Sequence, residues 1–138
     1  MKNYVVYFIL LTPLVSCNKD DEICDTALSE LSSQQFDGTI YLCNGDANNA
    51  QWLDATANVT SYTAADITVH VASDSAFIDT TVTYSYNCDV VEDDIPLIYL
   101  LDGQGNEMGQ YNKNPDRILL RFDHGNCQGN THFEGQAI

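Results

Sequence analysis

The stretch FIDTTVTYSYNCDV, residues 77–90, decides the fold class of this chain, because its character alternates from one residue to the next. The even-numbered residues from Ile78 to Val90 are largely apolar, whereas the odd-numbered residues from Asp79 to Asp89 are all polar. Successive side chains of a β-strand point to opposite faces of a sheet. A period of two therefore predicts one long strand with a buried face and a solvated face.

Seven more stretches, rich in β-branched and aromatic residues or in alternating character, are predicted as strands. They lie at 39–43, 55–62, 67–71, 95–101, 107–111, 117–123 and 132–134. Turn sequences separate them, including DGQGN at 102–106 and NPD at 114–116. A short helix at 25–35, with Asp25 as N-cap, precedes them. Since no helical crossover fits between the strands, we expect an all-β antiparallel meander of about eight strands, forming a barrel or alternatively a β-sandwich.

This order of elements, with its opening Phe36-Asp37-Gly38, resembles the lipocalin-like (calycin) barrels of small secreted lipoproteins. The resemblance covers roughly residues 36 to 135. The usual Gly-x-Trp signature is absent, since Trp52 lies well after Gly38. The resemblance implies a small-molecule or glycan ligand, held in the barrel mouth or on its loops.

The N-terminus has the layout of a secretory signal peptide, with Lys2, an apolar run at 4–15 and the small residue Ser16 before Cys17. The apolar run is shorter than the roughly 20 residues that a membrane-spanning helix needs. Leu14-Val15-Ser16-Cys17 resembles the lipobox of bacterial lipoproteins, which implies lipidation of Cys17.

The next residues, NKDDE at 18–22, resemble the surface-export signal of Bacteroidota-type lipoproteins. That resemblance implies a protein anchored in the outer membrane by lipid and facing the cell exterior. We therefore expect a signal peptide at 1–16, a lipidated cysteine with a flexible acidic tether at 17–23, and a single all-β domain at 24–138.

Acidic residues dominate the composition, with 20 Asp and Glu against five Lys and Arg and a formal net charge of −15. Such a balance repels nucleic acid and favours basic partners. No Lys or Arg lies between Asp20 and Asn112. An anionic ligand would be expected at the C-terminal cluster of bases, unless these bases pair with acids; the cluster is Lys113, Arg117, Arg121, His124 and His132.

The cysteine count of five is odd, and lipidation of Cys17 would leave four. Four thiols in an exported chain indicate two disulfides with three possible pairings. We expect Cys24–Cys43 and Cys88–Cys127, which close loops of modest length. The absence of a CxxC pair argues against a zinc ribbon or a thioredoxin-like redox site.

Catalytic and metal-binding motifs are weak. The spacing of His124, Cys127 and His132 fits no familiar metal loop, and residues 102–107 lack the ligand run of a calcium loop. No serine lies in a nucleophile elbow, and nothing selects two of the many acids as a catalytic pair. We therefore expect no enzyme activity, no metal and no cofactor.

The leading expectation is non-enzymatic binding of a small molecule or glycan, which a cavity lined by Tyr84, Tyr86, Ile118 and Leu120 would favour. The alternative is a protein-interaction module, an accessory subunit of a surface complex or an inhibitor of a basic protein such as lysozyme. The YLCNG stretch at 41–45 resembles the start of the membrane-bound c-type lysozyme inhibitors. A filled interior with exposed aromatic residues such as those at 52 and 62 would favour this alternative.

Overall fold

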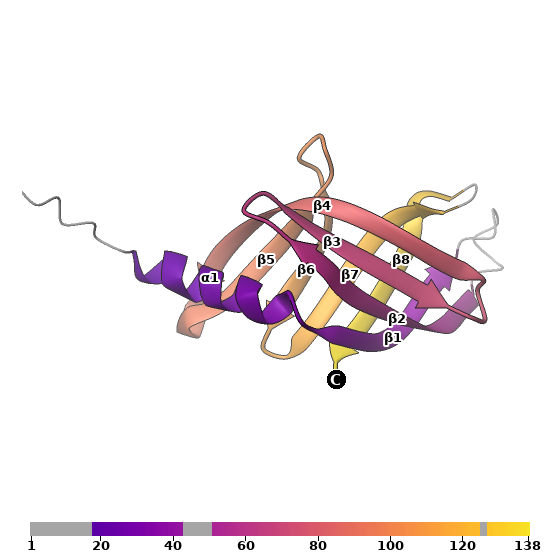
Figure 1. Cartoon of the computed structure of the whole chain (residues 1–138), viewed down its shortest axis with the longest axis horizontal. Coiled ribbons are helices and arrows are strands. Elements are labelled where there is room, and N and C mark those ends of the chain that lie inside the picture. The colour runs from indigo at the N-terminus through magenta and orange to yellow at the C-terminus, as the bar shows by residue number, and fades with distance from the viewer. Residues whose placement is uncertain (1–17, 43–50, 125–126) are drawn as a thin grey trace, which may run out of the picture.

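The computed structural model describes residues 18–42, 51–124 and 127–138, without the side chains of residues 51, 124 and 127–130. These ranges form a helix and eight strands, followed here in chain order (Figure 1). They are α1 (Lys19–Leu31), β1 (Gln35–Leu42), β2 (Gln51–Tyr62), β3 (Asp66–Ser73), β4 (Ile78–Val91), β5 (Ile95–Leu101), β6 (Glu107–Lys113), β7 (Asp116–His124) and β8 (Cys127–Ala137). A 3₁₀ turn, η2 (Glu92–Asp94), joins β4 to β5.

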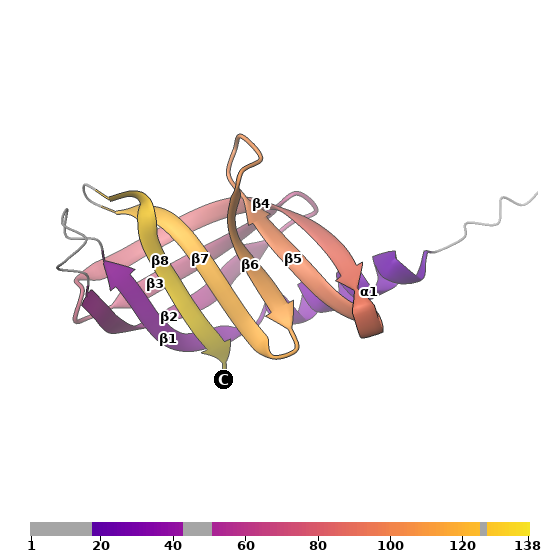
Figure 2. The ribbon, with the colours of Figure 1, turned by 180° about the vertical axis from the view of Figure 1, so that it is seen from behind.

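The eight strands form a closed antiparallel barrel in which each strand pairs with its sequence neighbours. The last strand returns to the first, with Phe133 opposite Ile40, so that β8 closes the barrel against β1 (Figures 1 and 2). Closure leaves no strand with an unpaired edge among the eight. The predicted all-β meander is confirmed, and the barrel rather than the sandwich is the correct alternative.

The stretch that predicts the fold class becomes β4. Ile78 and Tyr84 are buried, whereas Asp79, Thr81 and Thr83 on the other face are exposed. The predicted strand at 95–101 coincides with β5. The last strand, β8, is much longer than the predicted 132–134. Glycine and polar residues hide its alternation in the sequence, so most of it is not predicted.

The barrel interior is filled by one apolar cluster. Its largest fully buried side chains include Tyr84, Tyr111, Phe36 and Phe133. The rings of Phe36 and Tyr111 meet edge to face, with centroids 6.1 Å apart. Such packing removes apolar surface from water at about 25 cal/mol per Å², which makes this cluster the main source of stability.

Two glycines let β1 and β8 approach each other at the closing seam. Gly38 lies opposite Gly135 in the register. A Cβ on Gly38 would overlap the backbone oxygen of Glu134, and a Cβ on Gly135 would overlap the ring of Phe133. Glycine is therefore required at position 38 for the seam to close, whereas at position 135 it leaves room for the ring of Phe133 on the same strand.

Helix α1 is attached to the barrel by apolar contacts, which bury Ala27, Leu28 and Leu31. Polar contacts add to these, because Lys19 Nζ lies 2.6 Å from Asp94 Oδ2 and Lys113 pairs with Glu30. None of the described helices is long and apolar enough to cross a membrane.

The predicted short N-terminal helix is confirmed, but it runs from Lys19 to Leu31 rather than over 25–35. It includes residues 19–23, which were expected to form a flexible tether. Asp20, Asp21 and Glu22 occupy its first turn. Acidic side chains there interact favourably with the positive end of the helix dipole. The charged run that suggests a solvated linker thus stabilises a helix start.

The disulfide pairing of Cys24 is also different from the expected one. Cys24 on α1 is bonded to Cys88 on β4, with Cα atoms 6.0 Å apart. The expected pairs rested on short loops, but α1 packs against β4 and brings together cysteines 64 residues apart. Cys43, and the side chain of Cys127, lie outside the described residues.

Candidate functional site

The side chains expected to line a cavity inside the barrel are packed in its apolar core. Tyr84, Ile118 and Leu120 are buried in the apolar cluster, and Tyr86 packs against it. The Tyr84 hydroxyl donates a hydrogen bond to the carbonyl oxygen of Arg121 across 3.0 Å. These four residues, expected to line a ligand cavity, instead fill the space between the strands.

A row of aromatic side chains crosses the outside of the barrel. Tyr41 on β1 lies opposite Trp52 on β2 and opposite His132 on β8. The ring centroid of Tyr41 is 5.2 Å from that of Trp52 and 4.8 Å from that of His132, the latter pair being stacked. Trp52 and His132 meet edge to face at 5.3 Å. We call these three residues the aromatic row.

The alternation of each strand places the aromatic row outside. The neighbouring residues Ile40 and Phe133 are fully buried in the barrel, so Tyr41 and His132 project outward. The side chain of Trp52 is 54% exposed. Sequence reasoning singles out Trp52 as an exposed aromatic, but it misses Tyr41 and assigns His132 to a cluster of bases. The β1–β2 pair makes Tyr41 and Trp52 neighbours, and only closure of β8 on β1 adds His132.

The predicted cluster of bases is largely neutralised. Arg117 pairs with Glu134 across β7 and β8, and Lys113 pairs with Glu30 on α1. These ion pairs remove two of the charges on which an anionic ligand would depend. Arg121, which lies opposite His132 in the register, is exposed at the end of the aromatic row. The side chain of His124 lies outside the described residues.

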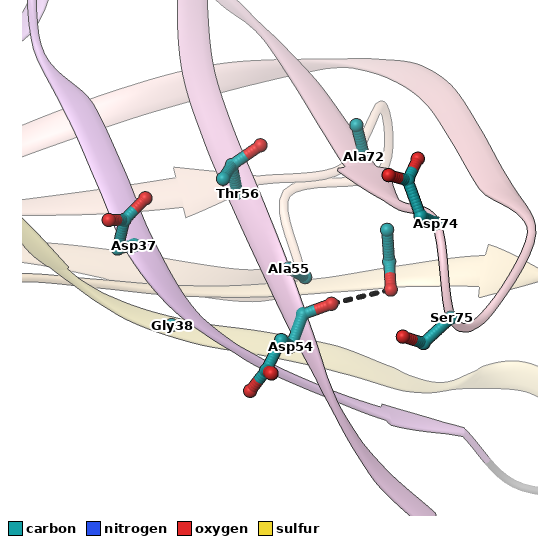
Figure 3. A pocket seen from close by; sticks show the side chains of 9 residues that line it. Asp37, Gly38, Asp54, Ala55, Thr56, Ala72, Asp74 and Ser75 are labelled. Atoms are coloured by element: carbon teal, nitrogen blue, oxygen red, sulfur yellow. Dashed lines mark hydrogen bonds between the residues drawn. The ribbon is translucent and has the colours of Figure 1, made fainter.

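A shallow hollow of about 560 Å³ adjoins the aromatic row on the outer side of β1, β2 and β3 (Figure 3). Asp37, Asp54 and Asp74 line it together with Thr56 and Ser75, and none of its lining residues is basic. Asp54 follows Trp52 by two residues on the same face of β2, which joins the two features. We call this the acidic hollow; its carboxylates can accept hydrogen bonds from hydroxyl or ammonium groups.

The glycine-rich turn at 102–106 is closed on itself. The Asp102 carboxylate accepts hydrogen bonds from the Asn106 side-chain amide at 2.8 Å and from the backbone N–H groups of Gln104 and Asn106 at 2.8 and 2.9 Å. These bonds, chiefly the one from the Asn106 side chain, lower the pKa of Asp102. Within the part of the chain that the structure describes, no group of three or more His, Cys, Asp or Glu side chains is placed to hold a metal.

A second aromatic pair lies at the opposite end of the barrel. Tyr62, at the end of β2, is 36% exposed and lies 6.0 Å from Tyr86 between ring centroids. The Tyr86 hydroxyl donates to the carbonyl oxygen of Thr63 at 3.2 Å. Desolvation, followed by the hydrogen bond with Tyr62, raises the pKa of Tyr86 to about 12. This pair therefore packs on the barrel rim and provides a matched control for the aromatic row.

No protein-family model matches this chain, and neither a curated protein nor a solved structure is detectably similar to it. Function is therefore inferred from the geometry of the barrel surface.

Proposed function

We propose that this chain is a lipid-anchored, non-enzymatic binding protein whose lipocalin-like barrel holds a saccharide on its outer surface, along the aromatic row. The single observation that carries the proposal is the contact of Trp52, Tyr41 and His132 across three strands, with more than half of the Trp52 side chain left exposed. Large aromatic side chains kept in water at one place commonly mark a binding site.

The chemistry of the row and of its surroundings suits a saccharide. The C–H faces of a sugar ring are apolar and pack against aromatic rings, while its hydroxyl groups need hydrogen-bond acceptors. Asp54 on β2 supplies such an acceptor two residues from Trp52 on the same strand face. The acidic hollow extends these acceptors beyond the row. An uncharged or amine-bearing sugar is favoured over an anionic one, because three carboxylates would repel the latter.

The filled interior supports a site on the outside of the barrel. Together with the exposed Trp52 and Tyr62 it also favours the protein-interaction alternative, so the same outer surface is a candidate for a protein partner. Ligands of lipocalin-like barrels are expected inside, but Tyr84, Ile118 and Leu120 are packed into the core here. Opening a cavity among them would expose apolar side chains and break the hydrogen bond of Tyr84. The outer face requires no such rearrangement.

The proposed anchor at Cys17 would orient this face away from the membrane. A single residue separates Cys17 from α1, and α1 is attached to the barrel by its apolar face and by the disulfide of Cys24. The aromatic row lies near the opposite end of the barrel from α1 (Figure 1). On an outer membrane facing the cell exterior, the row would meet environmental glycans. Replacing Cys17 by Ala should release the protein into soluble fractions, and continued membrane association would contradict the anchor.

The test uses Trp52 as its own reporter, since it is the only tryptophan in the chain. Purified protein is titrated with neutral, amine-bearing and anionic oligosaccharides while tryptophan emission is followed. We expect a saturable change in emission with at least one neutral or amine-bearing sugar. Tyr41→Ala and His132→Ala should weaken the binding several-fold, because each removes a ring that touches Trp52.

Tyr62→Ala is the matched control, because it removes an exposed aromatic ring from the far end of β2. It should leave the affinity unchanged. Unchanged emission across the whole panel would reject the saccharide proposal, as would equal losses of affinity in the control and in Tyr41→Ala.

A further inference from the structure

Phe77 is the most exposed large apolar residue among those that the structure describes, with 93% of its surface in water. It ends the turn between β3 and β4, and its backbone φ is +53°. Glycine and asparagine adopt such angles readily, whereas an aromatic residue rarely does. One residue thus combines an unfavourable backbone conformation with an unfavourable exposure, and neither serves the packing of the barrel.

The turn that carries Phe77 is held firmly in place. Ser73 is buried, and its hydroxyl donates to the carbonyl oxygen of Asp54 at 2.6 Å. The Ser73 hydroxyl oxygen in turn accepts a hydrogen bond from the backbone N–H of Ala76 at 3.3 Å. The backbone N–H of Phe77 donates to the carbonyl oxygen of Asp74 at 3.3 Å. A ring presented on such a pre-organised turn loses little conformational entropy when it binds.

The surroundings of the ring are acidic. Asp74 lies in the turn and Asp79, which pairs with His70, lies just beyond it; both are exposed. Asp74 and Ser75 also line the acidic hollow together with Asp37 and Asp54 (Figure 3), so the turn borders the hollow. A partner that covers Phe77 would bring its own charges against these carboxylates.

We propose that the 74–77 turn is a docking site for a basic protein, which would bury Phe77 in an apolar pocket and lay Lys or Arg side chains over the acidic hollow. An aromatic anchor surrounded by charges of one sign is typical of an interface with a partner of the opposite charge. The net charge of −15 would steer such a partner toward this surface. This site goes beyond the proposed saccharide binding, because its anchor is Phe77 rather than Trp52 or Tyr41; the two sites share only the acidic hollow.

The first test asks whether Phe77 serves the fold. Phe77→Asn places at this position a residue that adopts a positive φ with less strain, and it removes the exposed ring. We expect the melting temperature to rise or stay constant. A fall in the melting temperature would overturn the inference, because it would show that the ring is structural.

The second test looks for the partner. The full-length chain is produced in its own cells with the photoreactive residue p-benzoylphenylalanine in place of Phe77, or in place of Tyr62 as the matched control. We expect an adduct specific to position 77 whose protein partner, identified by mass spectrometry, is strongly basic. No adduct specific to position 77, or an adduct with an acidic protein or a lipid, would overturn the inference.

The identified partner is then purified and its affinity for the full chain is measured. Phe77→Asn should weaken binding at least about tenfold, as for the central anchor of an interface. Salt on the order of 0.5 M should also weaken it by screening the carboxylates. Tyr62→Ala should have no effect, and equal affinities in all three proteins would refute docking at the turn. Emission of Trp52 with saccharides should be unchanged in Phe77→Asn, which separates this outcome from that of the proposed function.

Discussion

The disulfide between Cys24 and Cys88 should contribute about 4 kcal/mol to the free energy of unfolding. The two cysteines are 64 residues apart, and a cross-link over a loop of that length removes a large part of the conformational entropy of the unfolded chain. The loop-entropy relation gives about 14 cal/mol/K, which is about 4 kcal/mol at 25 °C. The expected Cys24–Cys43 pair closes a much shorter loop and would have contributed closer to about 3 kcal/mol.

Denaturant unfolding measures this contribution. Cys24→Ser, Cys88→Ser and the double variant are compared with the unchanged chain. Each single variant should lose about as much stability as the double, because either one removes the same cross-link. Additive losses from the two single variants would refute the reasoning, since they would indicate two independent packing defects. The buried apolar face of α1 remains in every variant, so the helical circular dichroism should persist.

Peptide mapping checks the pairing directly. Trypsin cannot separate the cysteines at 24, 43 and 88, because no Lys or Arg lies between Asp20 and Asn112. A protease that cleaves before aspartate places the cysteines at 24, 43, 88 and 127 in four different peptides. We expect a linked peptide pair containing Cys24 and Cys88. In a chain lipidated at Cys17, two disulfides in the intact mass would then leave Cys43 and Cys127 as the other pair. A linked Cys24–Cys43 peptide would contradict the structure.

Three further changes test local features. Asp102→Asn should destabilise the protein at neutral pH, because the pKa of the native carboxyl lies below its ordinary 3.8. The difference in stability between the two proteins should fade as acid protonates that carboxyl, and a difference independent of pH in denaturation curves would contradict this. Burial raises the pKa of Tyr84 above its ordinary 10.0, so the contribution of Tyr84 to stability should be constant below pH 10 and should fall above it as the unfolded chain ionises. Stability should therefore fall less steeply above pH 10 in Tyr84→Phe, and equal slopes of the two proteins in alkaline denaturation would count against the burial argument. Gly38→Ala should lower the free energy of unfolding by about 3 kcal/mol or prevent folding, because the added Cβ would overlap the backbone of β8. A melting temperature like that of the unchanged chain would mean that the seam between β1 and β8 can open to accommodate the Cβ.

The strand pattern is largely predictable because it depends on neighbouring residues. The alternation at 77–90 becomes β4, and the apolar run at 95–101 becomes β5. Predictions fail where local composition is ambiguous. The charged run after Asn18 reads as a solvated linker, although its acids occupy the first turn of α1. Glycine and polar residues in β8 obscure a strand that is paired along most of its length.

The candidate sites are less predictable, because each joins residues that are distant in the chain. Trp52 is expected to be exposed, but its contact with Tyr41 and His132 depends on the register of β2, β1 and β8. The strain at Phe77 is a property of the turn between β3 and β4, and the sequence shows only an apolar residue at the start of a predicted strand.

By itself the sequence determines the all-β class, the number and order of the strands and the acidic surface, since these follow from side-chain period, turn chemistry and composition. Tertiary structure alone decides that the barrel closes through Gly38 and Gly135, that Cys24 meets Cys88, and that the interior is filled. The physical reason is that local patterns fix which face of a strand is apolar, whereas register and closure fix which distant residues meet across it.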